Sequence, residues 1–421
     1  MSSLAPIESA RARKVLDSRG RLTIEVEVET ALGGIGRFSA PSGASVGAHE
    51  AAAFPRGGVE EALKLFREEV APKLIGMDSS DQRGVDEALR ELDGTPNFER
   101  LGGSMAIACS IAVAKAASHS FGLPLYRWLG GAMANRIPAP LGNVLGGGKH
   151  AAVRTLDIQE VLVFPLDASS ALEAVMANAE VHRRLPSRIA KVDPSFAGGR
   201  TDEGAWTARL SGRQALALVK EVCEEVSDEL GCRMGLGIDL AASSLWDDKA
   251  KVYRYEGEGA VRSMEEQLSF VESLLEEFNL LYVEDPFHEE DFESFAQLTR
   301  RVAPRMVCGD DLFTTNVERL RRGVESGAAN AVIIKPNQVG TLTDTFEAAA
   351  LARSKGYTLV ASHRSGETED EALPHIAIAL SAQLIKTGVV GGERTAKLNE
   401  LVRIEEEAPS SRVATFTFQP P

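Results

Sequence analysis

Acidic side chains stand at the ends of short apolar runs in the second half of the chain. Asp239 ends "MGLGID", Glu284 ends "LLYVE" and Asp310 ends "RMVCGD". Gathered in one place without a partner, three carboxylates would repel one another and raise each other's pKa. A hard divalent cation removes that cost, and ligation by oxygen alone favours Mg²⁺ over zinc. The three residues together predict a magnesium site, although each one taken singly could instead cap a helix or pair with an arginine.

Two lysines end further apolar runs of the same kind, Lys335 in "NAVIIK" and Lys386 in "AQLIK". A single lysine in such a place is most often a salt-bridge partner. Two ammonium groups beside a metal ion are expected to depress each other's pKa, and a lysine with a lowered pKa is a usable base near neutrality. The pair therefore predicts proton abstraction from a carbon next to a metal-bound carboxylate.

The segment "VASHRSGETED" places a histidine, an arginine and a hydroxyl side by side where another apolar run stops. The guanidinium fork of Arg364 and the hydroxyl of Ser365 suit a phosphate or carboxylate group. With His363 beside them, they predict an anion clamp next to the base and the metal. The chemistry expected is formation of an enediolate-like intermediate, followed by departure of a group.

The spacing of these residues indicates the elements that must position them. Beyond residue 140, apolar runs alternate with helical stretches, and the polar ends at Asp310, Lys335, His363 and Lys386 recur every 23 to 28 residues. That is the length of one strand–helix repeat. A parallel (β/α) barrel gathers the carboxyl ends of its strands at one mouth, which favours a barrel. The alternative is an open doubly wound sheet, which brings fewer strand ends to one site.

The first part of the chain has a different texture. Residues 22–30, "LTIEVEVET", place Ile24, Val26 and Val28 at period two, which predicts a strand with one buried face. Residues 36–50 predict a second strand that runs into a Gly/Ser loop, and residues 59–76 and 105–122 have helical patterns. Strands followed by helices indicate an α+β unit. The expected domains are therefore 1–134 (α+β) and 135–421 (barrel).

Composition narrows the function classes. The 421 residues are 44% hydrophobic and 25% charged, as in an ordinary globular protein, and the net charge of -15 argues against a nucleic-acid surface. No apolar stretch reaches membrane-span length and no secretory h-region opens the chain, so the expected location is the cytoplasm, with no membrane partner. The four cysteines form no CxxC pair, which indicates reduced, buried thiols.

Two other motifs could indicate a different function, but each match is weak. "GASVG" at Gly43–Gly47 matches G-x-S-x-G but lacks the buried strand that a nucleophile elbow needs. "GNVLGGGKH" fails as a phosphate loop, because Asn143 and His150 replace required residues.

The chain resembles the enolase family, the glycolytic 2-phosphoglycerate dehydratases, over essentially its full length. The motifs that carry the resemblance are "VLDSRG", "PSGAS", "DLAASS", "EDPF", "GDDL", "KPNQVGTLTD", "SHRSGETED" and "QLIKTG". The resemblance implies an enolase-type (β/α)8-like barrel with an irregular start and a smaller N-terminal α+β capping domain. It also implies an Mg²⁺-dependent lyase interconverting 2-phosphoglycerate and phosphoenolpyruvate. A lysine base combined with one or two Mg²⁺ ions is the established general example for the enolase superfamily, and the chemistry expected above follows that known pattern.

The resemblance also implies roles for individual residues. Lys335 would be the base at C2, and Lys386 would face the substrate carboxylate with His363 nearby. Glu203, supported by Glu160, would be the acid that assists departure of the C3 hydroxyl.

The remaining implied roles concern binding. Asp239, Glu284 and Asp310 would hold the first Mg²⁺, and Ser45 would join a second Mg²⁺ that arrives with substrate. Arg364 and Ser365 would hold the phosphate. Gln159 and His150 would also bind substrate, His150 from a closing loop. The expected partner is a small anionic phosphorylated carboxylate, and the expected assembly is a homodimer or higher homo-oligomer.

Several loop residues depart from the family pattern. Arg21, Val46 and Arg200 replace usual residues, Ala205-Trp206 replaces Gly-Phe, and one extra residue lies between His150 and Glu160. Loops that close over a substrate set specificity. Two alternatives therefore stay open: a paralogue acting on a related phospho- or phosphono-carboxylate, and a catalytically weak enolase-like binding protein.

Overall fold

The computed structural model describes residues 4–43, 49–148, 156–408 and 410–417. Its centre is a closed barrel with strand order β11-β12-β13-β14-β15-β5-β6-β7. The closed ring confirms the predicted barrel and excludes the open sheet. The bounds are β5 Ala139–Gly146, β6 Glu160–Pro165, β7 Met234–Asp239, β11 Tyr282–Glu284, β12 Met306–Gly309, β13 Ala331–Ile334, β14 Thr358–Ser362 and β15 Leu384–Lys386.

The barrel strands read as apolar runs because both of their faces are covered. Every residue of β5, β6, β12 and β13 is buried. Strands that face the barrel interior on one side and helices on the other have no solvent-exposed face, so alternation of polar and apolar residues disappears. This is why the sequence shows runs that end abruptly in charged residues.

One strand runs against the others. β6 pairs antiparallel with both β5 and β7, whereas the other neighbouring barrel strands pair in parallel. Glu160, the first residue of β6, lies opposite Asp239, the last residue of β7. The reversed strand therefore brings its amino end to the mouth where its neighbours bring their carboxyl ends.

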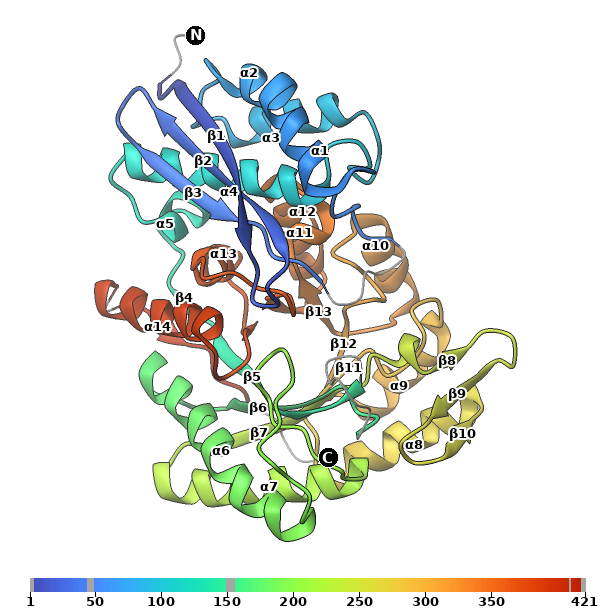
Figure 1. Ribbon diagram of the computed structural model, residues 1–421. Coiled ribbons are helices and arrows are strands. Elements are labelled where there is room, and N and C mark those ends of the chain that lie inside the picture. The colour runs from blue at the N-terminus through green and yellow to red at the C-terminus, as the bar shows by residue number, and fades with distance from the viewer. Residues whose placement is uncertain (1–3, 44–48, 149–155, 409, 418–421) are drawn as a thin grey trace.

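Helices surround the barrel (Figure 1). α7 and α8 begin with capping boxes, Ser211 with Gln214 and Ser263 with Glu266, which satisfy backbone N–H groups at the helix starts. A small antiparallel sheet, formed by β8 Trp246–Asp247, β9 Val252–Tyr255 and β10 Ala260–Arg262, projects from one side. The helices are α6 Ala171–Val192, α7 Gly212–Leu230, α8 Met264–Glu277, α9 Phe292–Val302, α10 Val317–Ser326, α11 Pro336–Val339, α12 Leu342–Ser354, α13 Ala372–Ala379 and α14 Gly392–Glu407.

The N-terminal unit is an antiparallel sheet in the order β1-β2-β3, packed on helices. Ile24, Val26 and Val28 of β2 are fully buried, as the alternation predicted. Gly36 lets β3 approach α4 closely, since a Cβ there would lie 2.0 Å from the carbonyl oxygen of Ala112. The elements are β1 Ile7–Leu16, β2 Leu22–Thr30, β3 Ile35–Ser39, α1 Gly58–Leu65, a π-helical turn at Phe66–Val70, α2 Ala71–Leu74, α3 Gln82–Asp93, α4 Gly103–Ser120 and α5 Leu125–Gly130.

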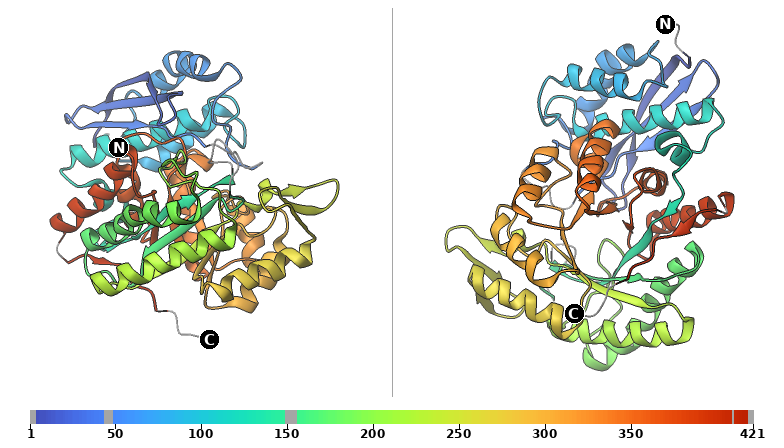
Figure 2. Two further views of the ribbon diagram at one scale, coloured as in Figure 1. Left: turned by 60° about the horizontal axis from the view of Figure 1, so that its bottom comes forward. Right: turned by 180° about the vertical axis from the view of Figure 1, so that it is seen from behind.

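The N-terminal unit packs against one side of the barrel (Figure 2). α3 and α4 contact α12, and α5 contacts α13. A short parallel pair, β4 Arg136–Ile137 with β16 Arg412–Val413, joins the start of the barrel to the C-terminal segment. The exact domain boundary at residue 134 stays a prediction. Within the described ranges, no helix has the length and apolar character needed to cross a membrane.

Candidate active site

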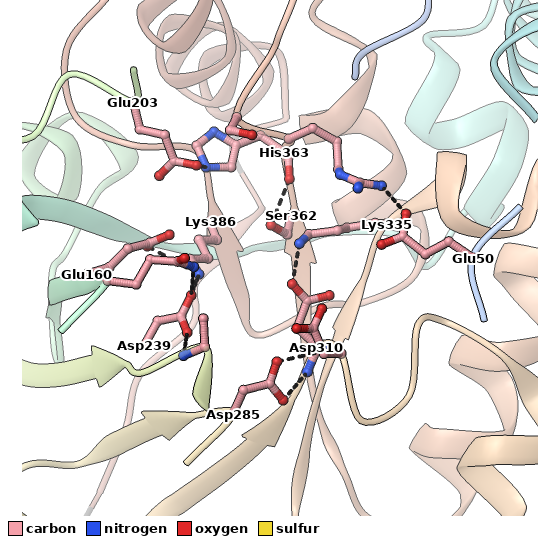
Figure 3. A pocket seen from close by; sticks show the side chains of 15 residues that line it. Glu50, Glu160, Glu203, Asp239, Asp285, Asp310, Lys335, Ser362, His363 and Lys386 are labelled. Atoms are coloured by element: carbon pink, nitrogen blue, oxygen red, sulfur yellow. Dashed lines mark hydrogen bonds and ion pairs between the residues drawn. The ribbon is translucent and has the colours of Figure 1, made fainter. Parts of the chain in front are cut away.

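A pocket opens at the mouth of the barrel, where the polar strand ends converge (Figure 3). Asp239 and Lys386 are the last residues of β7 and β15, and Asp310, Lys335 and His363 directly follow β12, β13 and β14. The wall residues are Glu50, Gln159, Glu160, Glu203, Asp239, Ala241, Asp285, Asp310, Asp311, Lys335, Ser362, His363, Arg364, Ser365 and Lys386. The barrel topology thus brings together side chains separated by more than 200 residues in sequence.

Lys386 lies at the centre of three carboxylates. Its Nζ is 2.9 Å from Glu284 Oε1, 3.1 Å from Asp239 Oδ2 and 3.2 Å from Glu160 Oε2. Burial by itself would lower the pKa of this lysine, but the three carboxylates outweigh it and the pKa is raised well above its ordinary value. In this arrangement Lys386 is a fixed cation.

Lys335 pairs with Asp310 in the same pocket. Burial would again lower the lysine pKa, and Arg364 and Lys386 also act to lower it, but the charge of Asp310 prevails and the pKa of Lys335 is raised. Lys386 thus lowers the pKa of Lys335, as expected, but this effect is smaller than the opposite effect of Asp310. Each ammonium group contacts at least one carboxylate directly, and these opposite charges dominate.

The predicted metal ligands do not all lie on the pocket wall. Asp239 and Asp310 line the pocket, whereas Glu284 is fully buried behind it. Tyr282 donates to Glu284 Oε2 at 2.6 Å. Burial raises the pKa of Glu284 to about 7, with the charges of Asp239 and Asp310 contributing. The fourth proposed ligand, Ser45, lies outside the described residues, as does His150.

Two acids that sequence reasoning left unused adjoin these ligands. Asp285 accepts from the backbone N–H groups of Asp310 at 3.0 Å and Asp311 at 2.7 Å. Among the described residues, Asp285, Asp310 and Asp311 form an acidic group whose oxygens lie within 4.8 Å of one another. Burial raises the pKa of Asp311 to about 7, and the charge of Asp310 adds to that effect. In the sequence, these two residues could have been found as the second acid of "EDPF" (Asp285) and the second acid of "GDDL" (Asp311).

The donor set fits a hard cation. Within the described part of the chain, seven carboxyl side chains line the pocket against three permanent cations, Lys335, Arg364 and Lys386. All of these acidic donors are oxygens, which suits Mg²⁺ better than a softer metal. The raised pKa values of Glu284 and Asp311 reflect buried negative charge that a cation would compensate.

Glu160 and Glu203 form a second acidic pair in the pocket. Asn143 Nδ2 donates to Glu203 Oε2 at 3.3 Å, and His363 Nε2 lies 3.7 Å from Glu203 Oε1. Burial, followed by the nearby charge of Glu203, raises the pKa of Glu160 well above its ordinary value. Glu160 therefore holds a proton more readily than an exposed glutamic acid does, which suits it to act as a proton source beside Glu203.

The predicted anion clamp is occupied by a side chain from the N-terminal unit. Arg364 Nη1 donates to Glu50 Oε2 at 2.8 Å and to Asn337 Oδ1 at 3.2 Å. Gln338 also donates toward Glu50, at 3.4 Å. Ser365 lines the same pocket, and Gln159 Nε2 donates to Asp239 Oδ2 at 3.3 Å. Sequence reasoning missed Glu50, because nothing in "AHEAA" indicates that a residue more than 300 positions away is its partner.

Some residues that depart from the family pattern fall within the described ranges, and none of these lines the pocket. The Arg200 guanidinium stacks over the Trp206 ring, 4.5 Å from its centroid, and Arg21 is exposed. Val46 and most of the segment between His150 and Glu160 lie outside the described residues. Arg200 thus acts as a partner of Trp206 and not as a wall residue.

Comparisons with known proteins agree over nearly the whole chain. Residues 7–129 match the family model described as "Enolase, N-terminal domain", and residues 134–417 match "Enolase, C-terminal TIM barrel domain". A protein named enolase from Methanothermobacter thermautotrophicus is 53% identical over 413 residues, covering 98% of this chain and 99% of the relative. Enolases from Archaeoglobus fulgidus (52% over 400 residues; 95% and 97%) and Pyrobaculum aerophilum (51% over 403 residues; 94% and 96%) are also similar.

Proposed function

The chain belongs to the enolase family, and from this we propose that it is a magnesium-dependent lyase that interconverts 2-phosphoglycerate and phosphoenolpyruvate. The observation that carries the proposal is the convergence of two lysines, the partly buried Lys335 and the buried Lys386, in one acid-lined pocket (Figure 3). Proton abstraction next to a carboxylate needs a base on one side and compensating positive charge on the other.

We assign the metal-holding role to Asp239, Glu284 and Asp310, with Ser45 joining a second ion that arrives with substrate. When bound, Mg²⁺ would supply Lewis-acid stabilisation of negative charge on the substrate carboxylate. Within the described residues, the excess of carboxyl groups over cations in the pocket supports this assignment.

We assign the base at C2 to Lys335. Asp310 is the group that holds the pKa of Lys335 high, so the lysine can accept a proton once the charge of Asp310 is compensated by another cation. Lys386 remains protonated beside Asp239, Glu284 and Glu160, which suits it to face the carboxylate of the substrate.

Departure of the C3 hydroxyl requires a proton, and we assign its delivery to Glu203 with Glu160. The raised pKa of Glu160 favours a proton in this pair, which supports the assignment. Arg364 and Ser365 would hold the phosphate, which must take over the guanidinium contact now made by Glu50. Gln159 and His150 would complete the substrate contacts.

The assay that tests this function follows the new conjugated double bond by ultraviolet absorbance. The purified full-length protein with 2-phosphoglycerate and Mg²⁺ should produce the signal, EDTA should abolish it, and added Mg²⁺ should restore it. No signal at high enzyme concentration would refute the proposal. Solvent deuterium exchange at the α-carbon of related phospho- and phosphono-carboxylates would then distinguish a paralogue from a binding protein.

A further inference from the structure

Arg394, the third residue of α14, is completely buried behind the His363-Arg364-Ser365 segment. Its Nη1 donates to the backbone carbonyl of Arg364 at 2.8 Å, and its Nη2 donates to that of Ser365 at 2.8 Å. Nη1 also lies 2.8 Å from Nδ1 of His363. The guanidinium therefore contacts all three residues of the clamp segment and is not itself part of the pocket wall.

The contact with His363 has only one chemically consistent interpretation. A guanidinium has five donors and no acceptor, and it stays protonated in proteins. Nδ1 of His363 must therefore be the acceptor and carry no proton. In neutral imidazole the proton then resides on Nε2, the nitrogen that faces Glu203 Oε1 at 3.7 Å.

We propose that Arg394 is a positioning residue that holds His363 as the neutral tautomer with its proton on Nε2. His363 then donates toward Glu203 and the substrate, and it does not act as a competing base or as an imidazolium. The tautomer is independent of the reaction, whereas its catalytic consequence rests on the function proposed above.

The charges around His363 support this interpretation from every side. Arg394 on α14, Lys386 at the end of β15 and Lys335 after β13 all disfavour a second proton on the ring, and Glu203 favours one. Burial, followed by the charge of Arg394, lowers the pKa of His363 well below its ordinary value. A second proton would also have to sit on Nδ1, where it would point at an N–H of Arg394.

A neutral His363 clarifies which groups of the pocket carry protons. It leaves the Glu160–Glu203 pair as the source of the proton for the C3 hydroxyl. It also keeps a hydrogen-bond donor beside Glu203 throughout the working pH range, so that the orientation of that carboxyl does not change with pH.

Nitrogen NMR tests the tautomer directly. In the full-length protein, with Mg²⁺ present and ¹⁵N in its seven histidines, the ring of His363 should show a bare Nδ1 and a protonated Nε2 and should not titrate between about pH 5 and pH 9. The variant His363→Gln assigns that ring by removing its signals. A protonated Nδ1, or titration of His363 within this range, would overturn the proposal even if no Arg394 variant folds.

Two variants test the part played by Arg394. In Arg394→Met, the pKa of His363 should rise toward its ordinary value, because the charge of Arg394 is lost while the burial of the ring remains. The value of kcat should fall by about 10- to 100-fold, with a new loss of activity toward acidic pH. Arg394→Lys keeps a charge and a donor, so both the pKa of His363 and kcat should lie between those of Arg394→Met and those of the wild type. Arg262→Met removes another largely buried guanidinium, remote from the pocket, and should leave the tautomer and the pH profile unchanged.

A purely structural role predicts a different pattern. If Arg394 only supports the carbonyls of Arg364 and Ser365, Arg394→Met would raise KM while the tautomer and the pH profile stay as in the wild type. That result would refute the proposal. Failure of the proposed lyase activity would appear separately, as a wild-type protein with the expected tautomer but no turnover.

Discussion

At the scale of single residues, Lys335 shows how one neighbour decides a chemical role. Asp310 keeps this lysine protonated in the structure, and compensation of the same carboxylate would release it as a base. The lysine and its controlling acid lie 25 positions apart in the chain, at the ends of adjacent strands. Adjacent strand ends thus couple the state of the proposed metal ligand to the state of the proposed base.

Arg364 provides a prediction at this scale. Arg364→Gln removes the charge and the fork that are expected to hold a phosphate, so KM for 2-phosphoglycerate should rise by about 10- to 100-fold, with a smaller change in kcat. Steady-state kinetics measure both parameters. Arg364→Lys keeps the charge but loses the fork, so its KM should lie between those of the wild type and Arg364→Gln. An unchanged KM in the glutamine variant would exclude the clamp role.

Part of the site could be predicted from residue types and part could not. Acids and lysines at the ends of apolar runs are visible in the sequence, and the structure places Asp239, Asp310, Lys335 and Lys386 on one pocket wall. The contact of Arg364 with Glu50 and the contact of His363 with Arg394 are invisible there. They depend on which helix or loop packs behind a strand end, and no local pattern encodes that.

At the scale of elements, the loop between α6 and α7 positions Glu203. Trp206 in this loop stacks on His182 of α6, with 4.9 Å between ring centroids, and donates from Nε1 to the His182 carbonyl at 2.8 Å. His182 Nε2 lies 2.9 Å from the carbonyl of Gly204, to which it donates. This stack fixes the loop immediately after Glu203.

The stack leads to a pH prediction. Burial lowers the pKa of His182 below its ordinary value of about 6.5, and the charge of Arg200 also acts to lower it. The stability that neutral His182 contributes is therefore complete above about pH 6.5 and is lost as the pH falls below it. Urea unfolding at about pH 7 and pH 5 should show a larger loss of stability for the wild type than for His182→Gln. Equal losses would show that His182 is not the responsible group.

The strands of the barrel were predictable from the sequence, except for the reversed direction of β6. Runs that end in a polar residue indicated parallel strands with a common mouth, and that interpretation holds for most of the barrel. β6 reverses the rule, because Glu160 stands at the start of its run. An apolar run buried on both faces has the same composition in either direction, so the reversal could not be read from periodicity.

At the scale of the whole molecule, the N-terminal unit supplies part of the pocket and is fastened to the barrel by partly buried polar contacts. Asp86 of α3 accepts from the backbone N–H of Thr343 at 2.9 Å and from its hydroxyl at 2.7 Å, at the start of α12. Lys115 of α4 pairs with Asp370 at 2.7 Å. Docking of the two units is thus a condition for the contact between Glu50 and Arg364.

Asp86→Ala tests this attachment. The substitution removes a buried carboxylate and leaves the partly buried Thr343 N–H without its acceptor, which should lower the free energy of unfolding by about 1–3 kcal/mol. Denaturant unfolding measures the change. Arg83→Ala, which breaks the exposed pair with Glu347 on the same two helices, should leave stability nearly unchanged. A similar effect of both substitutions would contradict a special role for the contact between Asp86 and Thr343.

The two-part architecture was predictable because texture changes along the chain, from alternating strands and amphipathic helices to repeated apolar runs. The way the parts meet was not. Contacts such as Asp86 with Thr343 join residues more than 250 positions apart, and each residue alone looks like an ordinary polar position on a helix.

The role of Lys335 as the base is best measured by exchange of the C2 hydrogen of 2-phosphoglycerate with solvent deuterium, followed by NMR in the presence of Mg²⁺. The wild-type protein should catalyse the exchange. Lys335→Ala should slow it by at least about 100-fold while Mg²⁺ binding, measured by calorimetry, stays close to that of the wild type. Exchange that persists in Lys335→Ala would show that another group removes the proton and would contradict the proposed mechanism.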